Sequence, residues 1–202
     1  DNFFNNALFT DPAVFAKYPE NLAEAFGANF TYDPADMQII KCDPDFIGLN
    51  IYHGKYVVPD GKGGIRDVTP EMNTPYTDMR WTVSPESLYY GPKAFSERYR
   101  LPIFITENGV AVTEWLSEDG KLHDPSRIEY IRRYLSQLKR AAEEGADIEG
   151  YFYWSLLDNF EWKEGFSKRF GLIYVDYNTL ERTPKDSAAY YANIIRENGK
   201  SL

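Results

Sequence analysis

A single carboxylate ends a short apolar run in this sequence. In LPIFITENGV, Glu107 follows the β-branched run 103–106, and the turn signal Asn108-Gly109 comes next. Such a run is typical of a parallel-sheet strand that is buried on both faces. An ionised carboxylate at that place is costly unless hydrogen bonds stabilise it, which indicates either a metal ligand or a nucleophile or base. From spacing alone, a surface glutamate that opens a loop is an equal alternative.

The composition restricts these chemistries. His53, His123 and the single cysteine, Cys42, are too few for a His/Cys metal cluster, so we expect no metal and no cofactor. The formal net charge of -9 argues against nucleic acid as a partner, and no apolar run reaches the length of a membrane span. A lone cysteine excludes an internal disulfide and permits a reducing compartment, so we expect a cytoplasmic protein.

Aromatic residues make up 16% of the chain, with 16 Tyr, 13 Phe and 4 Trp. Much of this can be ordinary core. Trp and Tyr also suit sites that offer an apolar face and a polar edge. A sugar ring, with its C–H face and its hydroxyls, is a ligand of that kind.

Three strand-like runs predict the framework that positions these groups. They cover residues 45–52, 102–107 and 148–157, and each is followed by a loop and then a helix. Buried strands that alternate with helices predict a parallel sheet. The long segment 57–75 is expected to be irregular.

Capping signals predict where the three helices begin. We expect the first at Ser84-Pro85 and the third at Thr183-Pro184. The second should begin with Asp124 as its N-cap, continue through apolar residues at helical spacing, and end at Gly145.

This order of elements fits part of a (β/α)8 barrel. It also fits part of an open doubly wound sheet, although no glycine-rich phosphate loop follows any strand. In a barrel the chemistry lies at the C-terminal ends of the strands. Those ends would present Asn50 and Tyr52, then Glu107, then Trp154.

Three motifs resemble one enzyme family. FITENG (104–109), DFIGLNIY (45–52) and the long stretch 150–177 together resemble the family 1 glycoside hydrolases, the β-glucosidases, β-galactosidases and their relatives. The likeness extends across nearly the whole chain. It implies an α/β fold that forms the C-terminal part, about strands six to eight, of a (β/α)8 TIM barrel.

The resemblance implies catalytic roles for the strand ends. Glu107 corresponds to the nucleophile that attacks the anomeric carbon and forms a covalent glycosyl-enzyme. Tyr52 corresponds to the tyrosine whose hydroxyl donates to that carboxylate. Asn50 corresponds to an asparagine that lines the same subsite.

The resemblance also implies a sugar site made from five further residues. Glu161 and Trp162 correspond to the pair that binds the glycon hydroxyls, Trp154 to the platform under the ring, Phe170 to a wall, and Trp81 to the leaving-group side. Taken without the family, Trp154 and Phe170 read more readily as core aromatics. A carboxylate at 161 would repel a 6-phosphate, so the expected glycon is unphosphorylated.

The second carboxyl group of a retaining glycosidase is missing from this sequence. The family carries its acid/base glutamate in a Thr-[Phe/Leu]-Asn-Glu-Pro motif, which does not occur here. Residues 1–202 therefore resemble the C-terminal half of one barrel domain, with the N-terminal half as the expected partner and a β-glucoside, or a β-galactoside, as the substrate. The alternative is an incomplete segment that only binds sugar or has a structural role.

Overall fold

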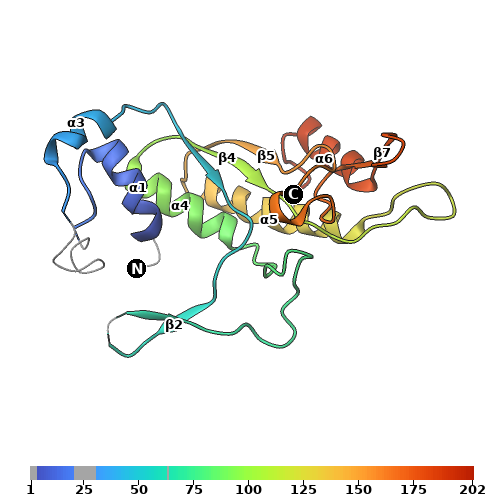
Figure 1. Ribbon diagram of the computed structural model, residues 1–202, viewed down its shortest axis with the longest axis horizontal. Coiled ribbons are helices and arrows are strands. Elements are labelled where there is room, and N and C mark those ends of the chain that lie inside the picture. The colour runs from blue at the N-terminus through green and yellow to red at the C-terminus, as the bar shows by residue number, and fades with distance from the viewer. Residues whose placement is uncertain (1–3, 21–30, 63) are drawn as a thin grey trace. The chain divides into compact units, whose positions relative to one another are not determined.

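The computed structural model describes residues 4–20, 31–62 and 64–202, which fall into two compact units. Residues 1–45 and 57–68 form one unit, and residues 46–56 and 69–202 form the other. Figure 1 shows the elements of both along the chain.

The first unit contains short elements. Helix α1 (Phe4–Phe15), the 3-10 turn η1 (Pro34–Asp36) and α3 (Met37–Ile40) precede a hairpin of β2 (Val57–Pro59) and β3 (Ile65–Asp67). The two strands pair antiparallel. The expectation that 57–75 is irregular was therefore wrong for its first part. The side chain of Asp60 accepts hydrogen bonds from the backbone N–H groups of Lys62 and Gly64 at 2.7 and 2.9 Å, which stabilises the tip that joins the strands.

The second unit is built on a three-stranded parallel sheet. Its strands are β1 (Ile47–Asn50), β4 (Ile103–Asn108) and β5 (Ile148–Tyr153), in the order β1-β4-β5. All three predicted strands are present. Strands β1 and β5 are shorter than their apolar runs, and β4 has the predicted length but begins one residue later. The parallel pairing predicted from the alternation with helices is confirmed.

Three helices follow these strands. They are α4 (Ser87–Tyr99), α5 (Pro125–Glu143) and α6 (Asp186–Arg196). The predicted start of α5 is confirmed, with Asp124 as N-cap, although its side chain makes no capping hydrogen bond. The helix ends just before Gly145, whose φ of +96° lies in the region that glycine tolerates best.

The predicted starts of the other two helices were wrong. The hydroxyl of Ser84 accepts from the backbone of Gly54 at 2.7 Å, and α4 begins only at Ser87. Thr183 lies in β7 (Arg182–Pro184), which pairs antiparallel with β6 (Ile173–Val175). Helix α6 therefore begins after this hairpin.

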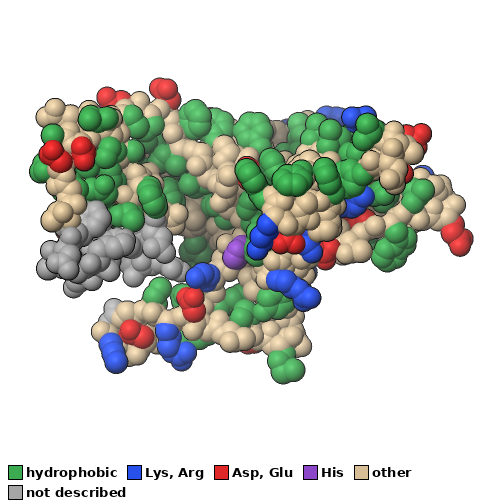
Figure 2. Space-filling model, in the orientation of Figure 1, with side chains coloured by type: hydrophobic (Ala, Val, Ile, Leu, Met, Phe, Trp, Pro, Cys, Tyr) green, Lys and Arg blue, Asp and Glu red, His purple; other side chains and the backbone are tan. Residues whose placement is uncertain are grey.

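One face of the parallel sheet is buried and the other is open. Ile103 and Ile105 of β4 are fully buried, as are Leu88 of α4 and Ile131 of α5. The alternate face carries Asn50 and Thr106, which are exposed, and Phe152, which is 58% exposed. The prediction that β4 is buried on both faces was therefore wrong: within the described part of this unit, helices cover one side of the sheet only. Figure 2 shows hydrophobic side chains gathered on the surface of this unit.

Candidate active site

A β-bulge at the end of β4 decides where Glu107 points. Leu49 of β1 lies opposite Ile105, but the next residue, Asn50, lies opposite Glu107, so Thr106 is an extra residue in β4. In a regular strand, Ile105 and Glu107 would point to the same face, the one covered by helices. The bulge breaks that alternation.

Asn108 takes the buried position that Glu107 would otherwise occupy. Its side chain is fully buried and donates to the carbonyl of Ile51 at 2.8 Å and to the hydroxyl of Tyr130, on α5, at 3.0 Å. The hydroxyl of Tyr151 donates to its Oδ1 at 2.9 Å. With the amide fixed on the helix side, the carboxylate of Glu107 is left at the end of the strand, only partly buried.

Tyr52 donates a hydrogen bond to Glu107. The phenolic oxygen lies 2.7 Å from Oε2 of the carboxylate. Burial, and then the hydrogen bond and charge of Glu107, raise the pKa of Tyr52 far above its usual value, so the phenol stays a donor. The carbonyl of Tyr52 accepts from the hydroxyls of Tyr130 and Tyr134, both at 3.1 Å, which fixes the segment after β1 against α5.

Aromatic rings surround the Tyr52 side chain. The centroid of Trp81 lies 5.1 Å from that of Tyr52, and Phe170 lies 6.0 Å from Tyr52 and 6.3 Å from Trp81. His53 stacks on Trp81 with centroids 5.4 Å apart. Phe170 is 2% exposed. These rings form an apolar wall beside the carboxylate.

Glu161 brings a second carboxylate into the same site. Burial raises its pKa, the negative charges of Glu107 and Glu164 raise it further, and a hydrogen bond with the Trp154 side chain lowers it. Its backbone N–H donates to the carbonyl of Gly165 at 2.7 Å across the short turn η2 (Trp162–Glu164). The loop thus holds Glu161 within the electrostatic range of Glu107.

Trp154 follows β5 and packs tightly against the segment after Glu107. The backbone N–H of Trp154 donates to the carbonyl of Asn108 at 2.8 Å, and the Trp154–Ser155 peptide bond is cis. A Cβ at Gly109 would lie 1.8 Å from the Trp154 carbonyl oxygen, so the sequence needs glycine there.

Most of the predicted site residues therefore meet. Glu107, Tyr52, Glu161 and Trp154 are joined by hydrogen bonds and charge, and Tyr52, Trp81 and Phe170 by ring contacts. Asn50 lies opposite Glu107, and its Oδ1 accepts from the hydroxyl of Thr106 at 2.7 Å.

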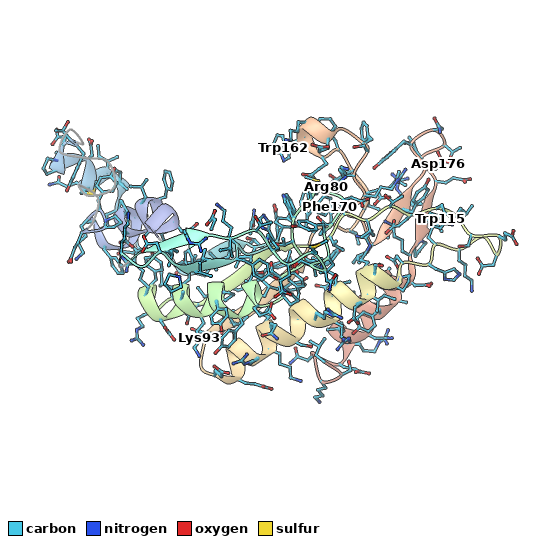
Figure 3. All side chains as sticks on the ribbon, turned by 90° about the horizontal axis from the view of Figure 1, so that it is seen from below. Arg80, Lys93, Trp115, Trp162, Phe170 and Asp176 are labelled. Atoms are coloured by element: carbon cyan, nitrogen blue, oxygen red, sulfur yellow. The ribbon has the colours of Figure 1, made fainter. Side chains whose placement is uncertain are left out.

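Trp162 differs from these residues in burial, because its side chain is 81% exposed. Figure 3 shows Trp162 and Phe170 on the side of the sheet away from α4 and α5. The open face and the site therefore share one side of the sheet.

Two residues without a predicted functional role lie at the site in the structure. The stacking of His53 on Trp81 is a packing contact, the role that a lone histidine usually has. Asn108 was interpreted only as part of a turn, although it is what holds the bulge. The one sequence signal for the role of Asn108 was its position, a polar amide directly after the acid that ends the strand.

Other site types can be checked over the part of the chain that the structure describes. There, no three His, Cys, Asp or Glu side chains come together as a metal site. Within the same residues, no helix combines the length and the apolar character needed to cross a bilayer.

The comparison with protein families decides the assignment. The model of glycosyl hydrolase family 1 matches residues 1–200. This chain belongs to glycosyl hydrolase family 1. The resemblance seen in the motifs is confirmed.

Family 1 relatives are similar along nearly the whole chain. The 1,4-beta-D-glucan glucohydrolase of Thermotoga neapolitana is 45% identical over 201 residues, which are 98% of this chain and 45% of that protein. Beta-glucosidase A of Thermotoga maritima is 42% identical over 200 residues, again 98% of this chain and 45% of that protein. The chain thus spans under half the length of the curated relatives it matches.

Solved family 1 structures share the fold. The family 1 β-glucosidase from Thermotoga maritima superposes with a TM-score of 0.85 at 42% identity, and covers 96% of this chain and 44% of its own. The same enzyme in complex with noeuromycin gives the same TM-score. The predicted fold class is confirmed: the chain is an α/β part of a (β/α)8 barrel.

Proposed function

We propose that this chain supplies the nucleophile and part of the glycon site of a retaining β-glycosidase. The substrate is an unphosphorylated β-glucoside, with β-galactosides as a second class. One observation carries the proposal: the Tyr52 hydroxyl donates to Glu107 at 2.7 Å, while the charge of Glu107 acts on Glu161 beside it. The β-glucosidases among the relatives support the same reaction class.

Glu107 performs the covalent step. Its carboxylate oxygen attacks C1 of the glycon, the bond from C1 to the leaving-group oxygen breaks, and an acid protonates that oxygen. Water then attacks C1 of the glycosyl-enzyme, gives up a proton to the same group acting as base, and releases Glu107. The hydrogen bond from Tyr52 orients the carboxylate for attack.

Glu161, Trp162 and Trp154 bind the glycon. The carboxylate of Glu161 accepts from sugar hydroxyls, the indole of Trp162 donates to another, and the ring of Trp154 lies against the C–H face. Asn50 lines the subsite of the nucleophile, Phe170 forms a wall around the sugar ring, and Trp81 flanks the leaving-group side. A negative charge at Glu161 disfavours a 6-phosphate, because two anions would meet in a partly buried site.

The acid/base comes from the rest of the barrel. Residues 1–202 form the C-terminal half of one barrel domain, with strands six to eight, and the N-terminal half is the partner. The sheet supports this division, because β1 and β5 lie at its edges and the face with Phe152 is open. Completing the barrel would pair the two edge strands and cover the open face. No nucleic acid or membrane takes part.

A mechanism-based label tests the nucleophile. The complete protein is incubated with a 2-fluoro glucoside that carries a dinitrophenyl leaving group, which needs little acid assistance, and is then digested and mapped by mass spectrometry. The adduct is expected on Glu107. Glu107→Gln should remain folded, take no label and lose turnover, whereas Glu118→Gln, at an exposed loop position, should behave as the parent.

The outcome separates enzyme from binding segment. A complete protein that binds glucose but yields no adduct at Glu107 has only a sugar-binding or structural role here. The phosphate prediction is tested with a matched pair, 4-nitrophenyl β-glucoside and its 6-phosphate. A higher kcat/KM for the phosphorylated member contradicts the role given to Glu161.

A further inference from the structure

A buried cluster of six charged side chains lies behind the site. Three are basic and three are acidic, so their formal charges cancel. At most 3% of each side chain is exposed, except for Arg169 at 19%. The members are Arg127, Arg169, Lys185, Glu114, Asp124 and Asp158.

Arg127 is the centre of one half of this cluster. Its Nε donates to Oδ2 of Asp124 at 2.9 Å, and its Nη2 forms an ion pair with Glu114. Asp124 is fixed in turn by Ser187, whose N–H and hydroxyl donate to it at 2.8 and 2.6 Å. The guanidinium is therefore held from α5, from the loop after β4 and from the start of α6.

The same guanidinium reaches the three segments that present the site. Nη1 donates to the carbonyl of Val110, to the hydroxyl of Tyr153 at 3.0 Å and to the carbonyl of Phe170 at 3.1 Å. Nη2 donates to the carbonyl of Arg169 at 3.2 Å. The N–H of Val110 also donates to Tyr153, at 3.4 Å.

Two of these contacts connect Arg127 to Glu107 through few intermediate residues. Val110 stands three residues after Glu107 on the same continuous segment. Phe170 contacts the ring of Tyr52, which donates to Glu107. Tyr153 is the residue before Trp154, so the third contact reaches the segment that bonds to Glu161.

Only an arginine can make this set of bonds. Its planar fork carries five N–H donors in fixed directions, whereas a lysine ammonium is a single point with three. Buried ion pairs contribute little net stability compared with apolar packing, so stability alone does not account for a buried guanidinium. Holding the segments of Val110, Tyr153 and Phe170 in one geometry does account for it.

We propose that Arg127 is a positioning residue for catalysis, which sets the geometry of Glu107 and of its aromatic wall through Val110, Phe170 and Tyr153. This inference rests on the proposed function. Arg127 does not touch the substrate, so its loss should slow the covalent step more than it weakens binding. Misplacement by about 1 Å can cost on the order of 10²-fold in rate.

The experiment measures labelling kinetics in the complete protein. Inactivation by the 2-fluoro glucoside gives a maximal rate constant and a half-saturating concentration for the parent, Arg127→Lys and Tyr153→Phe. Arg127→Lys should lower the maximal rate about 10- to 100-fold and change the half-saturating concentration less than about threefold. Tyr153→Phe removes the hydroxyl that accepts from Arg127 and from the Val110 N–H, and should lower the maximal rate by a smaller factor. Arg133→Lys, at an exposed position on the same helix, is the matched control and should label at the parent rate.

The labelling results distinguish the proposed function from the role of Arg127. If the parent itself takes no label, the proposed function fails and the role of Arg127 fails with it. If the parent is labelled, and a folded Arg127→Lys is labelled at the same maximal rate, this inference alone is overturned. If Arg127→Lys does not fold, Tyr153→Phe decides: an unchanged maximal rate overturns the inference and a lowered one supports it.

Discussion

The hydroxyl of Tyr52 lies 2.7 Å from Oε2 of Glu107, although the two residues are 55 positions apart in the chain. Tyr52 follows β1, and Glu107 lies in the neighbouring strand β4. The bond depends on backbone contacts on both sides. Tyr130 and Tyr134 fix the carbonyl of Tyr52, and Asn108 fixes the bulge that turns Glu107 toward the phenol.

Tyr52→Phe should lower kcat/KM for aryl β-glucosides about 10- to 100-fold. A hydrogen bond to a charged group is worth about 1.5–3 kcal/mol, and each 1.4 kcal/mol is tenfold. Because the pKa of Tyr52 is raised, the parent keeps this donor across the neutral range, and the ratio of the two enzymes should not change between about pH 6 and 9. Tyr56→Phe, at a 42% exposed side chain, is the control. Equal kcat/KM for parent and Tyr52→Phe would remove Tyr52 from the mechanism.

Glu161→Gln should stabilise the protein slightly at neutral pH. Burial and the charges of Glu107 and Glu164 raise the pKa of Glu161, so the folded state binds its proton more tightly than the unfolded chain does. Stability from this group is thus highest at low pH and falls as pH rises through the raised pKa. We expect a Tm increase of about 1–2 °C at pH 7, small because solvent screens the charge, and less at about pH 4. A difference that grows toward low pH contradicts the assignment.

The same variant should impair sugar binding. Glu161→Gln should raise KM or lower kcat/KM for glucosides with good and poor leaving groups alike, since its partner is the glycon. A raised pKa is also what a general acid needs. If activity is lost only on substrates with poor leaving groups, Glu161 is the proton donor and the missing-acid proposal is wrong.

Substitutions at two aromatic residues of the site should differ in their effects on stability and on sugar binding. Phe170→Ala, at a 2% exposed side chain, should cost about 3–5 kcal/mol of unfolding free energy and also lower activity. Trp162→Ala, at an 81% exposed side chain, should change stability by about 0.5 kcal/mol or less and still raise KM. Denaturant unfolding and steady-state kinetics on the same preparations test both. An unchanged KM in Trp162→Ala would place Trp162 outside the glycon site.

His123 should add stability only at the acidic side of neutrality. Hydrogen bonds with Asp186 and then with Asp119, at 2.5 and 3.1 Å, raise the pKa of His123. Its contribution is complete below the unfolded value of about 6.5 and is lost as pH rises through the folded value. His123→Gln should therefore lower Tm at about pH 6 and leave it unchanged at about pH 9.

A substitution at a hydrogen-bond partner of His123 serves as the control. Asp119→Asn removes one of the two acceptors, so it should reproduce part of the loss at about pH 6. If His123→Gln lowers Tm equally at both pH values, its role is packing and not charge.

Local patterns in the sequence predicted much of the framework. Apolar runs fixed the three parallel strands, and Pro125 with Gly145 fixed the ends of α5, because strand burial and helix termination are local properties. Ser84 and Thr183 failed as helix starts. Their neighbours in space, Gly54 and the β6 strand, offered other hydrogen bonds that no local signal reveals.

The motifs by themselves predicted the family, which the comparison confirmed, and they supplied the candidate site residues, because chemistry depends on residue type. Only the tertiary structure decided the direction of Glu107. Strand alternation alone would turn that carboxylate toward the helices, and the bulge that prevents this is set by hydrogen bonds from Asn108 to Ile51 and Tyr130. The joining of three site segments through Arg127 was likewise decided by folding, because its partners lie up to 43 residues away in the chain.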